Sequence, residues 1–542
     1  MRLRPRPARQ RGADWVRPGG SGRWTTVGNL DSPERALVDP AGLVAIAGRD
    51  WSLDWWIGAE DRWHVPAREV AVRQALIGDS PVVETRVRVP SGDAVQRVYG
   101  ARGLAGEDVL VVEVHNDTKV PFAVALAVRP YGLDGVGGIG ILTLDGTTVT
   151  VDGEPSLGLP RSPGRMVLAT GDEGDAAEAV FAGAAQPGGT VTRRCPDRLA
   201  NAALLFPLAH TATLRVVLPL APGAMVDPSL LPAADQVASG WGVHARAATR
   251  FEVPNRRLRE AVSASVRFVL LATGDPRVAP ALDLVGLVDE AAASLLVDPL
   301  ALARTDRPGA VLHALGQHWR LHRDADAAKA SAPIVAALVG RLDRGGDEND
   351  RGLGQRALPS VADLLEGAGE ARGAADVRAV MTPVAEPGRD RSDDIEALLG
   401  SASPTWTWAS GAIGHDVSRN GELLTAVRHL LVQEVAGGLA LSPMVPEPWL
   451  GQGWEVHGAP TAAGRLSFAV RWHGERPALL WELDAHDGLP PARLTIPGLD
   501  PGWSSTEPRG EVLLSPVAVP ERAAPRRGLS IPVTIEPMQR SS

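Results

Sequence analysis

The spacing of hydrophobic residues changes twice along this 542-residue chain, and that change constrains its fold more than any other feature. From about residue 20 to 250, apolar and polar residues alternate in short runs that end at turn residues, as in ETRVRVPSGDAVQRVYGA and TATLRVVLPLAPG. Alternation at period two is typical of half-buried strands. Many strands at this spacing predict a large antiparallel β-sandwich. Within it, Asn116 and Asp117 of VHNDTKVPF are expected at a hairpin turn.

Helices replace strands near residue 251. Leu258, Val262, Val266 and Leu270 follow one another at steps of four, which is the spacing of one helix face. The stretch HALGQHWRLHRDADAAKASAPIVAALVGRL predicts a helical hairpin with a polar HRDAD turn. Sequential antiparallel helix pairs build bundles or toroids. Further helices are predicted at 281–297, 309–322, 325–343, 359–370, 374–381 and 417–436.

The alternating pattern returns after about residue 455, in GRLSFAVRWHGERPALLWELDAHDG and ARLTIPGL. We therefore expect a multidomain β + α protein with a sandwich, a helical region and a small β-domain, in that order. The predicted limits are a flexible N-terminus at 1–20, the antiparallel β-sandwich at 21–250, the helical domain at 251–454, and a small C-terminal β-domain with a loose tail at 455–542.

Charge and cysteine content exclude several classes of protein. The 55 basic and 64 acidic residues give a net charge of -9 with no basic stripe, which argues against nucleic-acid binding. Cys195 is the only cysteine, so no intramolecular disulfide and no cysteine-based metal site can form, and a cytoplasmic location is favoured. The first residues are basic but no apolar signal core follows them. The longest apolar stretches are far shorter than the ~20 residues that a membrane span needs.

Several phrases of the helical and C-terminal parts resemble the six-hairpin glycosidases, the glucoamylase-like and phosphorylase-like enzymes with an (α/α)6 toroid. RTDRPGAVLHALGQHWRLHRD at 304–324 is similar to the family segment in which Asp-Ala-Asn-Gly precedes a Gly-x-His-Trp-Arg-Leu helix. LVGLVDEAAASLL at 284–296 looks like the preceding helix, and PTWTWASGAIGHD at 404–416 looks like the loop before the last long helix. The passage at 439–474 resembles the entry into the terminal sheet. The resemblance covers roughly 255–490.

The sequence departs from this family in three respects. Arg307 and Pro308 replace the Ala-Asn of the family segment. A full toroid needs twelve helices, whereas the roughly 200 residues available have room for about seven to nine of ordinary length, which predicts a shortened or open toroid. No Trp-Glu-x-Arg-Gly element, which carries the general acid in glucoamylase-like relatives, is present.

The resemblance implies hydrolysis of an α-linked oligosaccharide or glycoside by single displacement. Such a reaction needs a protonated carboxyl and a carboxylate about 6.5–9.5 Å apart. The candidates for these groups are Glu348, in the Gly-flanked loop GGDEND, together with Asp363 and Asp416. Asp306, which matches the family segment, is the candidate for substrate contact. Each of these acids has an alternative role, since Asp306, Asp363 and Asp416 could cap helices and Glu348 could lie on a solvated loop.

Tryptophan outnumbers phenylalanine and tyrosine together, 15 against 6 and 2. A flat indole can stack on the apolar face of a sugar ring while its N–H finds a polar partner. Trp55 and Trp56 lie in the densest aromatic and acidic cluster, WSLDWWIGAEDRWHVPARE, where core packing is the alternative role. Trp406 and Trp408 lie at period two in the loop expected at the toroid mouth, and form a candidate sugar platform.

His313, His318 and His322 are close together on one predicted helix, and the last two share a face at i and i+4. This spacing suits a zinc site, but the Glu of His-Glu-x-x-His is missing and the neighbouring sequence supplies no third ligand. We therefore assign these histidines to packing and hydrogen bonding, and expect no metal and no cofactor.

Two classes of function follow from the sequence. The first is a glycoside hydrolase of carbohydrate metabolism. The second is a non-catalytic relative that binds a glycan or a protein partner. A scaffold with no affinity for sugars is a third possibility. The favoured ligand is an oligosaccharide or glycoside, and the sequence does not predict the oligomeric state.

Overall fold

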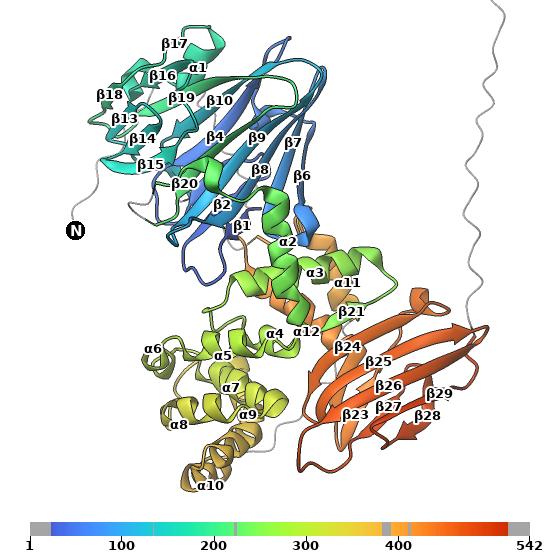
Figure 1. Ribbon diagram of the computed structural model, residues 1–542. Helices are drawn as coiled ribbons and strands as arrows, with labels where there is room; N and C mark the ends of the chain where they lie inside the picture. The colour runs from blue at the N-terminus through green and yellow to red at the C-terminus, as the bar shows by residue number, and fades with distance from the viewer. Residues whose placement is uncertain (1–22, 134, 222–224, 382–391, 410–413, 519–542) are drawn as a thin grey trace, which may run out of the picture.

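The structure is a computed structural model, which describes residues 23–133, 135–221, 225–381, 392–409 and 414–518 (Figure 1). It contains an N-terminal antiparallel β-sandwich, a helical region and C-terminal sheets, in the predicted order. The predicted flexible N-terminus and most of the predicted loose tail lie outside the described residues. None of the described helices is both long and apolar enough to cross a membrane.

Two large sheets form the sandwich, and all neighbouring strands within them are antiparallel. In the described residues the first sheet runs β1 (Thr25–Gly28), β2 (Arg35–Val38), β3 (Val44–Ile46), β4 (Ser52–Gly58), β10 (Phe122–Arg129), β19 (Asn201–Leu208), β16 (Arg165–Ala169) and β17 (Gln186–Pro187), with β5 (Trp63–His64) paired to β4. The second runs β18 (Val191–Arg194), β13 (Ile141–Asp145), β14 (Thr148–Val151), β15 (Glu154–Gly158), β20 (Thr213–Pro219), β9 (Asp108–Thr118), β8 (Gly92–Arg102), β7 (Val82–Val89) and β6 (Val72–Leu76). A short pair, β11 (Tyr131–Gly132) and β12 (Gly135–Val136), lies apart from both.

The hairpin predicted at Asn116 and Asp117 is wrong. Strand β9 belongs to the second sheet and β10 to the first, so the connection after Thr118 passes from one sheet to the other. Asn116 is completely buried at this crossing, where its amide donates to Val120 O at 2.9 Å and Leu208 O at 3.1 Å. Its side-chain oxygen also accepts from the backbone N–H of Thr118. The asparagine therefore satisfies the polar backbone of a buried crossing, rather than that of an exposed turn.

The sandwich core fills the space between the two sheets, and alternation along each strand decides which side chains enter it. On β4, Leu53, Trp55 and Ile57 point into this core. Trp56 points to the opposite face, where Val180 and other residues of helix α1 (Ala176–Phe181) cover it. Both tryptophans are therefore fully buried, each on a different face of the same sheet.

The helical region begins after α2 (Ala234–His244), which packs on the sandwich. Its described helices are α3 (Arg256–Leu271), α4 (Ala279–Leu284), α5 (Val288–Leu296), α6 (Pro299–Ala303), α7 (Pro308–His322), α8 (Ala325–Val339), α9 (Glu348–Gly367), α10 (Ala371–Ala379), α11 (Ser392–Ser401) and α12 (Val417–Leu431). The predicted hairpin is α7 and α8. The helix predicted at 281–297 is divided between α4 and α5 by Gly286, whose φ of 78° is left-handed.

Two hydrophobic cores divide these helices. Helices α3, α4, α11 and α12 share one core with the C-terminal sheets, while α5 to α10 form another around Leu312, Val335 and Leu358. In Figure 1, α5 to α10 accordingly form a group apart from the orange and red C-terminal strands.

The C-terminal part has two sheets. In the described residues one consists of β21 (Arg250–Glu252), β24 (Trp454–Thr461), β25 (Gly464–His473), β26 (Arg476–Ala485) and β29 (Arg509–Leu513). The other consists of β22 (Val432–Val435), β23 (Gly438–Leu441), β27 (Arg493–Ile496) and β28 (Asp500–Ser505), with β23 and β27 parallel. Because β21 precedes the helical region and pairs with β24 after it, the two ends of that region meet in one sheet.

Candidate functional site

Glu348 and Asp363, two of the predicted catalytic acids, lie on one helix. Glu348 is the exposed first residue of α9 and follows Asp347, which caps the helix by accepting from the backbone N–H of Asp350. The predicted loop around Glu348 and the predicted helix start near 359 are therefore wrong. Fifteen residues at 1.5 Å each place Asp363 about 22 Å further along the helix, well beyond the ~10 Å limit for two carboxyls flanking one glycosidic bond. Asp363 is also largely exposed and pairs with Arg378 at 3.3 Å.

Asp416 caps helix α12, where its carboxylate accepts from the backbone N–H of Ser418 at 3.2 Å and from the hydroxyl of the same residue. Such a cap satisfies amides that have no partner within the helix. This is the alternative role that the sequence left open for Asp416.

Asp306 lies on the surface just before α7, and does not cap it. The carboxylate that does so comes from Asp350 on α9, which accepts from the backbone N–H groups of Gly309 and Ala310, both at 2.9 Å. Asp350 is 1% exposed, and its charge is balanced by the positive end of the α7 dipole. No local sequence pattern predicts this contact, because the two partners are about 40 residues apart.

Trp55 and Trp56 have no surface to offer a ligand in this structure. The indole N–H of Trp55 donates to Ala41 O at 3.0 Å, and that of Trp56 donates to Asp54 at 2.9 Å. The guanidinium of Arg129 lies over the Trp56 ring, 5.4 Å from its centre. Buried and fully bonded indoles of this kind stabilise a core.

Trp406 and Trp408 differ from each other in exposure. Trp408 is 5% exposed, and its indole N–H donates to Leu398 O at 3.1 Å. Trp406 is only half-buried, and the exposed Arg257 places its guanidinium carbon 5.7 Å from the ring centre. Of the four tryptophans predicted to contact substrate, Trp406 is thus the one that is not buried.

The backbone at Trp406 is unusual and firmly held. Its φ of 55° lies in the left-handed region, which bulky residues seldom adopt; such strained residues cluster at functional sites. The amide of Asn420 donates to Trp406 O at 3.1 Å, which ties the loop to α12. Asn420 also bonds to His415 Nε2 at 2.8 Å, and burial lowers the pKa of that imidazole to about 4. The imidazole is therefore neutral near pH 7.

Buried hydroxyl groups also hold residues 403–408, which form the part of the Trp406 loop that the structure describes. The Ser403 hydroxyl accepts from the backbone N–H groups of Thr405 and Thr407, at 3.2 and 3.1 Å. The Thr405 hydroxyl in turn contacts that of Thr25 on β1 at 2.7 Å, which joins the loop to the sandwich. All four hydroxyl-bearing residues are buried, so the loop presents Trp406 from a rigid base.

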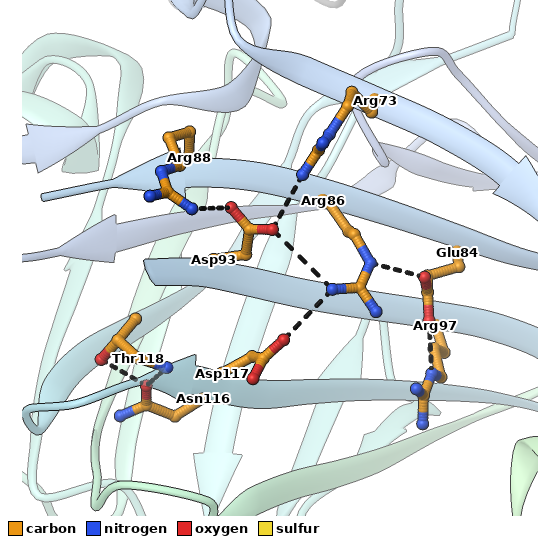
Figure 2. Close-up of polar contacts among 9 residues, drawn as sticks. All are labelled: Arg73, Glu84, Arg86, Arg88, Asp93, Arg97, Asn116, Asp117 and Thr118. Atoms are coloured by element: carbon orange, nitrogen blue, oxygen red, sulfur yellow. Dashed lines mark hydrogen bonds and ion pairs between the residues drawn. The ribbon is translucent and has the colours of Figure 1, made fainter. Parts of the chain in front are cut away.

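A second polar cluster covers the outer face of β6 to β9 in the sandwich (Figure 2). Glu84 lies between Arg86 and Arg97, at 2.7 and 2.9 Å, while Asp93 lies between arginines of β6 and β7. Charges of opposite sign thus alternate across neighbouring strands, as favourable cross-strand pairs do. This face presents a solvated ion-pair network rather than a field of one sign.

A third cluster joins α4, α7 and the start of α8. Asp283 and His318 are both buried, with 2.7 Å between Asp283 Oδ1 and His318 Nδ1. His322 Nε2 lies 3.3 Å from the same oxygen, and His318 Nε2 lies 3.3 Å from Asp324 Oδ2. Burial lowers the pKa of His318, but the bonds to Asp283 and Asp324 outweigh it and raise the pKa above its usual value.

Asp283, His318 and His322 are the residues that could hold a metal ion in the described part of the chain. The histidine spacing in the sequence identified two of these three residues, His318 and His322. The missing carboxylate comes from α4, which lies 35 residues before His318 and contacts α7. No local pattern links the two segments, so the sequence could not reveal the cluster.

Comparison with known proteins gives a distant structural likeness only. No protein-family model matches the sequence, and a search of curated proteins finds no similar sequence. Among solved structures, a protein described as a kojibiose phosphorylase from the human microbiome matches with a TM-score of 0.39 at 7% identity, over 92% of this chain and 95% of that one. A family GH92 α-mannosidase from Bacteroides thetaiotaomicron matches with a TM-score of 0.32 at 9% identity, over 67% of this chain and 64% of that one.

Proposed function

We propose that this chain is a carbohydrate-binding protein that holds an α-linked oligosaccharide at the Trp406 loop, and that Glu348 and Asp363 do not hydrolyse it as a pair. The observation that carries the proposal is Trp406 itself. Its side chain is partly exposed, its backbone is left-handed, and its loop is anchored to both the sandwich and α12.

The chemistry around Trp406 suits a sugar. An indole offers a flat apolar face that matches the C–H face of a pyranose ring. Beside it, Arg257 is exposed, donates to Leu399 O at 2.6 Å, and has several further N–H groups that could bond to sugar hydroxyls. Because residues 403–408 are already held by hydrogen bonds, binding at Trp406 would cost little ordering entropy.

Separation of the acids supports the non-catalytic part of the proposal. Two carboxyls about 22 Å apart along one helix cannot flank the same glycosidic bond. Asp416 is engaged as a helix cap, which leaves its carboxylate bonded to the start of α12. We therefore place recognition, rather than hydrolysis, at the centre of the function.

Calorimetric titration with maltotriose, kojibiose and α-mannobiose tests this proposal. We expect at least one sugar to bind the wild-type chain, and W406A to lower its affinity at least about fivefold, since stacking on an aromatic ring is worth about 1 kcal/mol or more. The matched control is W408F, which changes a buried tryptophan two residues away and should keep the affinity. Absence of binding, or equal binding by W406A, would overturn the proposal.

A second measurement addresses catalysis. Each sugar is incubated with the wild-type chain and with E348Q/D363N, and newly formed reducing ends are measured. We expect none from either protein. Release by the wild type that the double variant abolishes would restore the hydrolase reading and contradict ours.

A further inference from the structure

We propose that Asp283, His318 and His322 form a binding site for one divalent transition-metal ion of the zinc class. The site lies where α4 packs against α7, and the proposal does not depend on the proposed sugar binding.

The spacing of the three side chains suits such an ion. Ligands 2.0–2.1 Å from a tetrahedral zinc ion lie about 3.3 Å from one another. Here His322 Nε2 and Asp283 Oδ1 are 3.3 Å apart, and one ligand atom from each residue lies within 4.8 Å of the others. His318 Nδ1 is hydrogen-bonded to Asp283 Oδ1 at 2.7 Å, and the ion would replace this bond. His318 and His322 present their rings on one face of α7 because they are one turn apart.

Two buried atoms of the cluster lack a hydrogen-bond partner, which points to a missing ligand. Asp283 Oδ2 and His322 Nε2 both make no hydrogen bond within the described residues, although the two side chains are 0% and 8% exposed. Buried polar atoms are nearly always bonded, and leaving one unsatisfied costs about 1–3 kcal/mol. A metal ion bound by both oxygens of Asp283 and by His322 Nε2 would give both atoms a partner.

The surroundings of His318 have the form of a metal-bound histidine. If Nδ1 binds the ion, Nε2 carries the proton and faces Asp324 Oδ2 at 3.3 Å. A carboxylate that accepts from the second nitrogen of a ligating histidine is the usual outer partner in zinc sites, where it orients the ring. Asp324 is itself held in place, because its other oxygen caps α8.

Charge and ligand type select the class of ion. Two carboxylates, Asp283 and Asp324, balance a doubly charged ion when both imidazoles are neutral. Two nitrogen ligands and one oxygen favour zinc, nickel or copper over calcium and magnesium, which prefer oxygen alone. Three protein ligands leave a fourth position for water or another small ligand.

Calorimetric titration of the full-length, tag-free protein with Zn²⁺, after dialysis against a chelator, tests the proposal. We expect one ion per chain. H322A removes a ligand that makes no hydrogen bond, and should weaken binding at least about 100-fold, while D324N, which alters the outer partner, should weaken it about 10- to 100-fold. The control H313Q changes a histidine of the same helix outside the cluster, and should bind like the wild type.

A spectroscopic measurement separates a built site from loose surface binding. Co²⁺ in place of Zn²⁺ should give the visible absorption of a tetrahedral ion in the wild type and in H313Q, and lose it in H322A. Circular dichroism confirms that each variant is folded, and D324N provides a second test if H322A is not. Absence of stoichiometric Zn²⁺ binding, or equal affinity in wild type and the folded cluster variants, would overturn the proposal.

Discussion

Asp39 is the residue whose replacement should change the pH dependence of stability most clearly. It follows β2 in the turn 39–42 and is completely buried. Its Oδ1 accepts from the backbone N–H groups of Ala41 and Leu43, both at 2.8 Å, while Oδ2 has no partner among the described residues. Burial raises the pKa of this carboxyl from 3.8 to about 7, against the opposing effect of these backbone bonds.

The sign and size of the effect follow from this pKa. Because the folded protein holds the proton more tightly than the unfolded chain, the protonated carboxyl stabilises the fold below about pH 4, and this stabilisation is lost as the pH rises to about 7. Raising the pKa of Asp39 by about three units changes the free energy of unfolding by about 4 kcal/mol in total. About 2.5 kcal/mol of this change occurs between pH 5 and pH 8. D39N keeps the acceptor oxygen but cannot ionise, so its stability lacks this pH dependence.

Hydrogen exchange of the peptide that contains Leu43 measures the effect locally, since that amide bonds to Asp39. Wild type and D39N are compared at each pH, which cancels the intrinsic pH dependence of exchange. We expect the free energy of opening in the wild type, relative to D39N, to fall by about 2.5 kcal/mol from pH 5 to pH 8. D39A removes the acceptor as well, and should be less stable than D39N by about 1–3 kcal/mol at every pH. A wild-type minus D39N difference that stays constant with pH would refute the reasoning.

Three further predictions concern packing and charge. R129A leaves its buried partner Asp175 without the ion pair between them, and should lower the free energy of unfolding by about 3–5 kcal/mol in urea titration; a loss below 1 kcal/mol would contradict this. G309A places a methyl group 1.8 Å from a backbone oxygen of α9, and should cost about 2 kcal/mol or more, whereas G352A on the open side of α9 should be neutral or stabilising by up to ~1 kcal/mol, as thermal melting would show. D93N removes a carboxylate shared by several arginines, and should cost about 1 kcal/mol at low salt and less at high salt; a cost that does not depend on salt would argue against an ion-pair effect.

Sequence periodicity predicted the architecture well where secondary structure depends on local pattern. Alternation identified the sandwich, and the helical pattern located α7 and the start of α8 to within a residue. It failed at α9, because Pro359 marks a typical helix start but here lies inside a helix that begins at Glu348. It failed again at Asn116, since the same turn-forming residue type also serves a buried crossing between sheets.

Features that depend on distant segments could not be predicted. Alternation indicated that Trp55 and Trp56 point to opposite faces, but not that α1 covers the outer one. The pairing of Asp350 with the start of α7, and of Asp283 with His318, joins segments with no common pattern in the sequence. Candidate acids were chosen by residue type and loop context, and neither property reports the distance between two side chains along or across helices.

Pairing of β21 with β24 sets the order in which the chain can fold during synthesis. Residues 250–252 leave the ribosome about 200 residues before their partner strand, which takes about 10–40 s at ordinary rates of translation. The sandwich can be complete during this interval, whereas Phe251 must wait for Val456. Chains that end early would therefore carry a folded N-terminal half beside an exposed strand edge, which is the kind of surface that promotes aggregation.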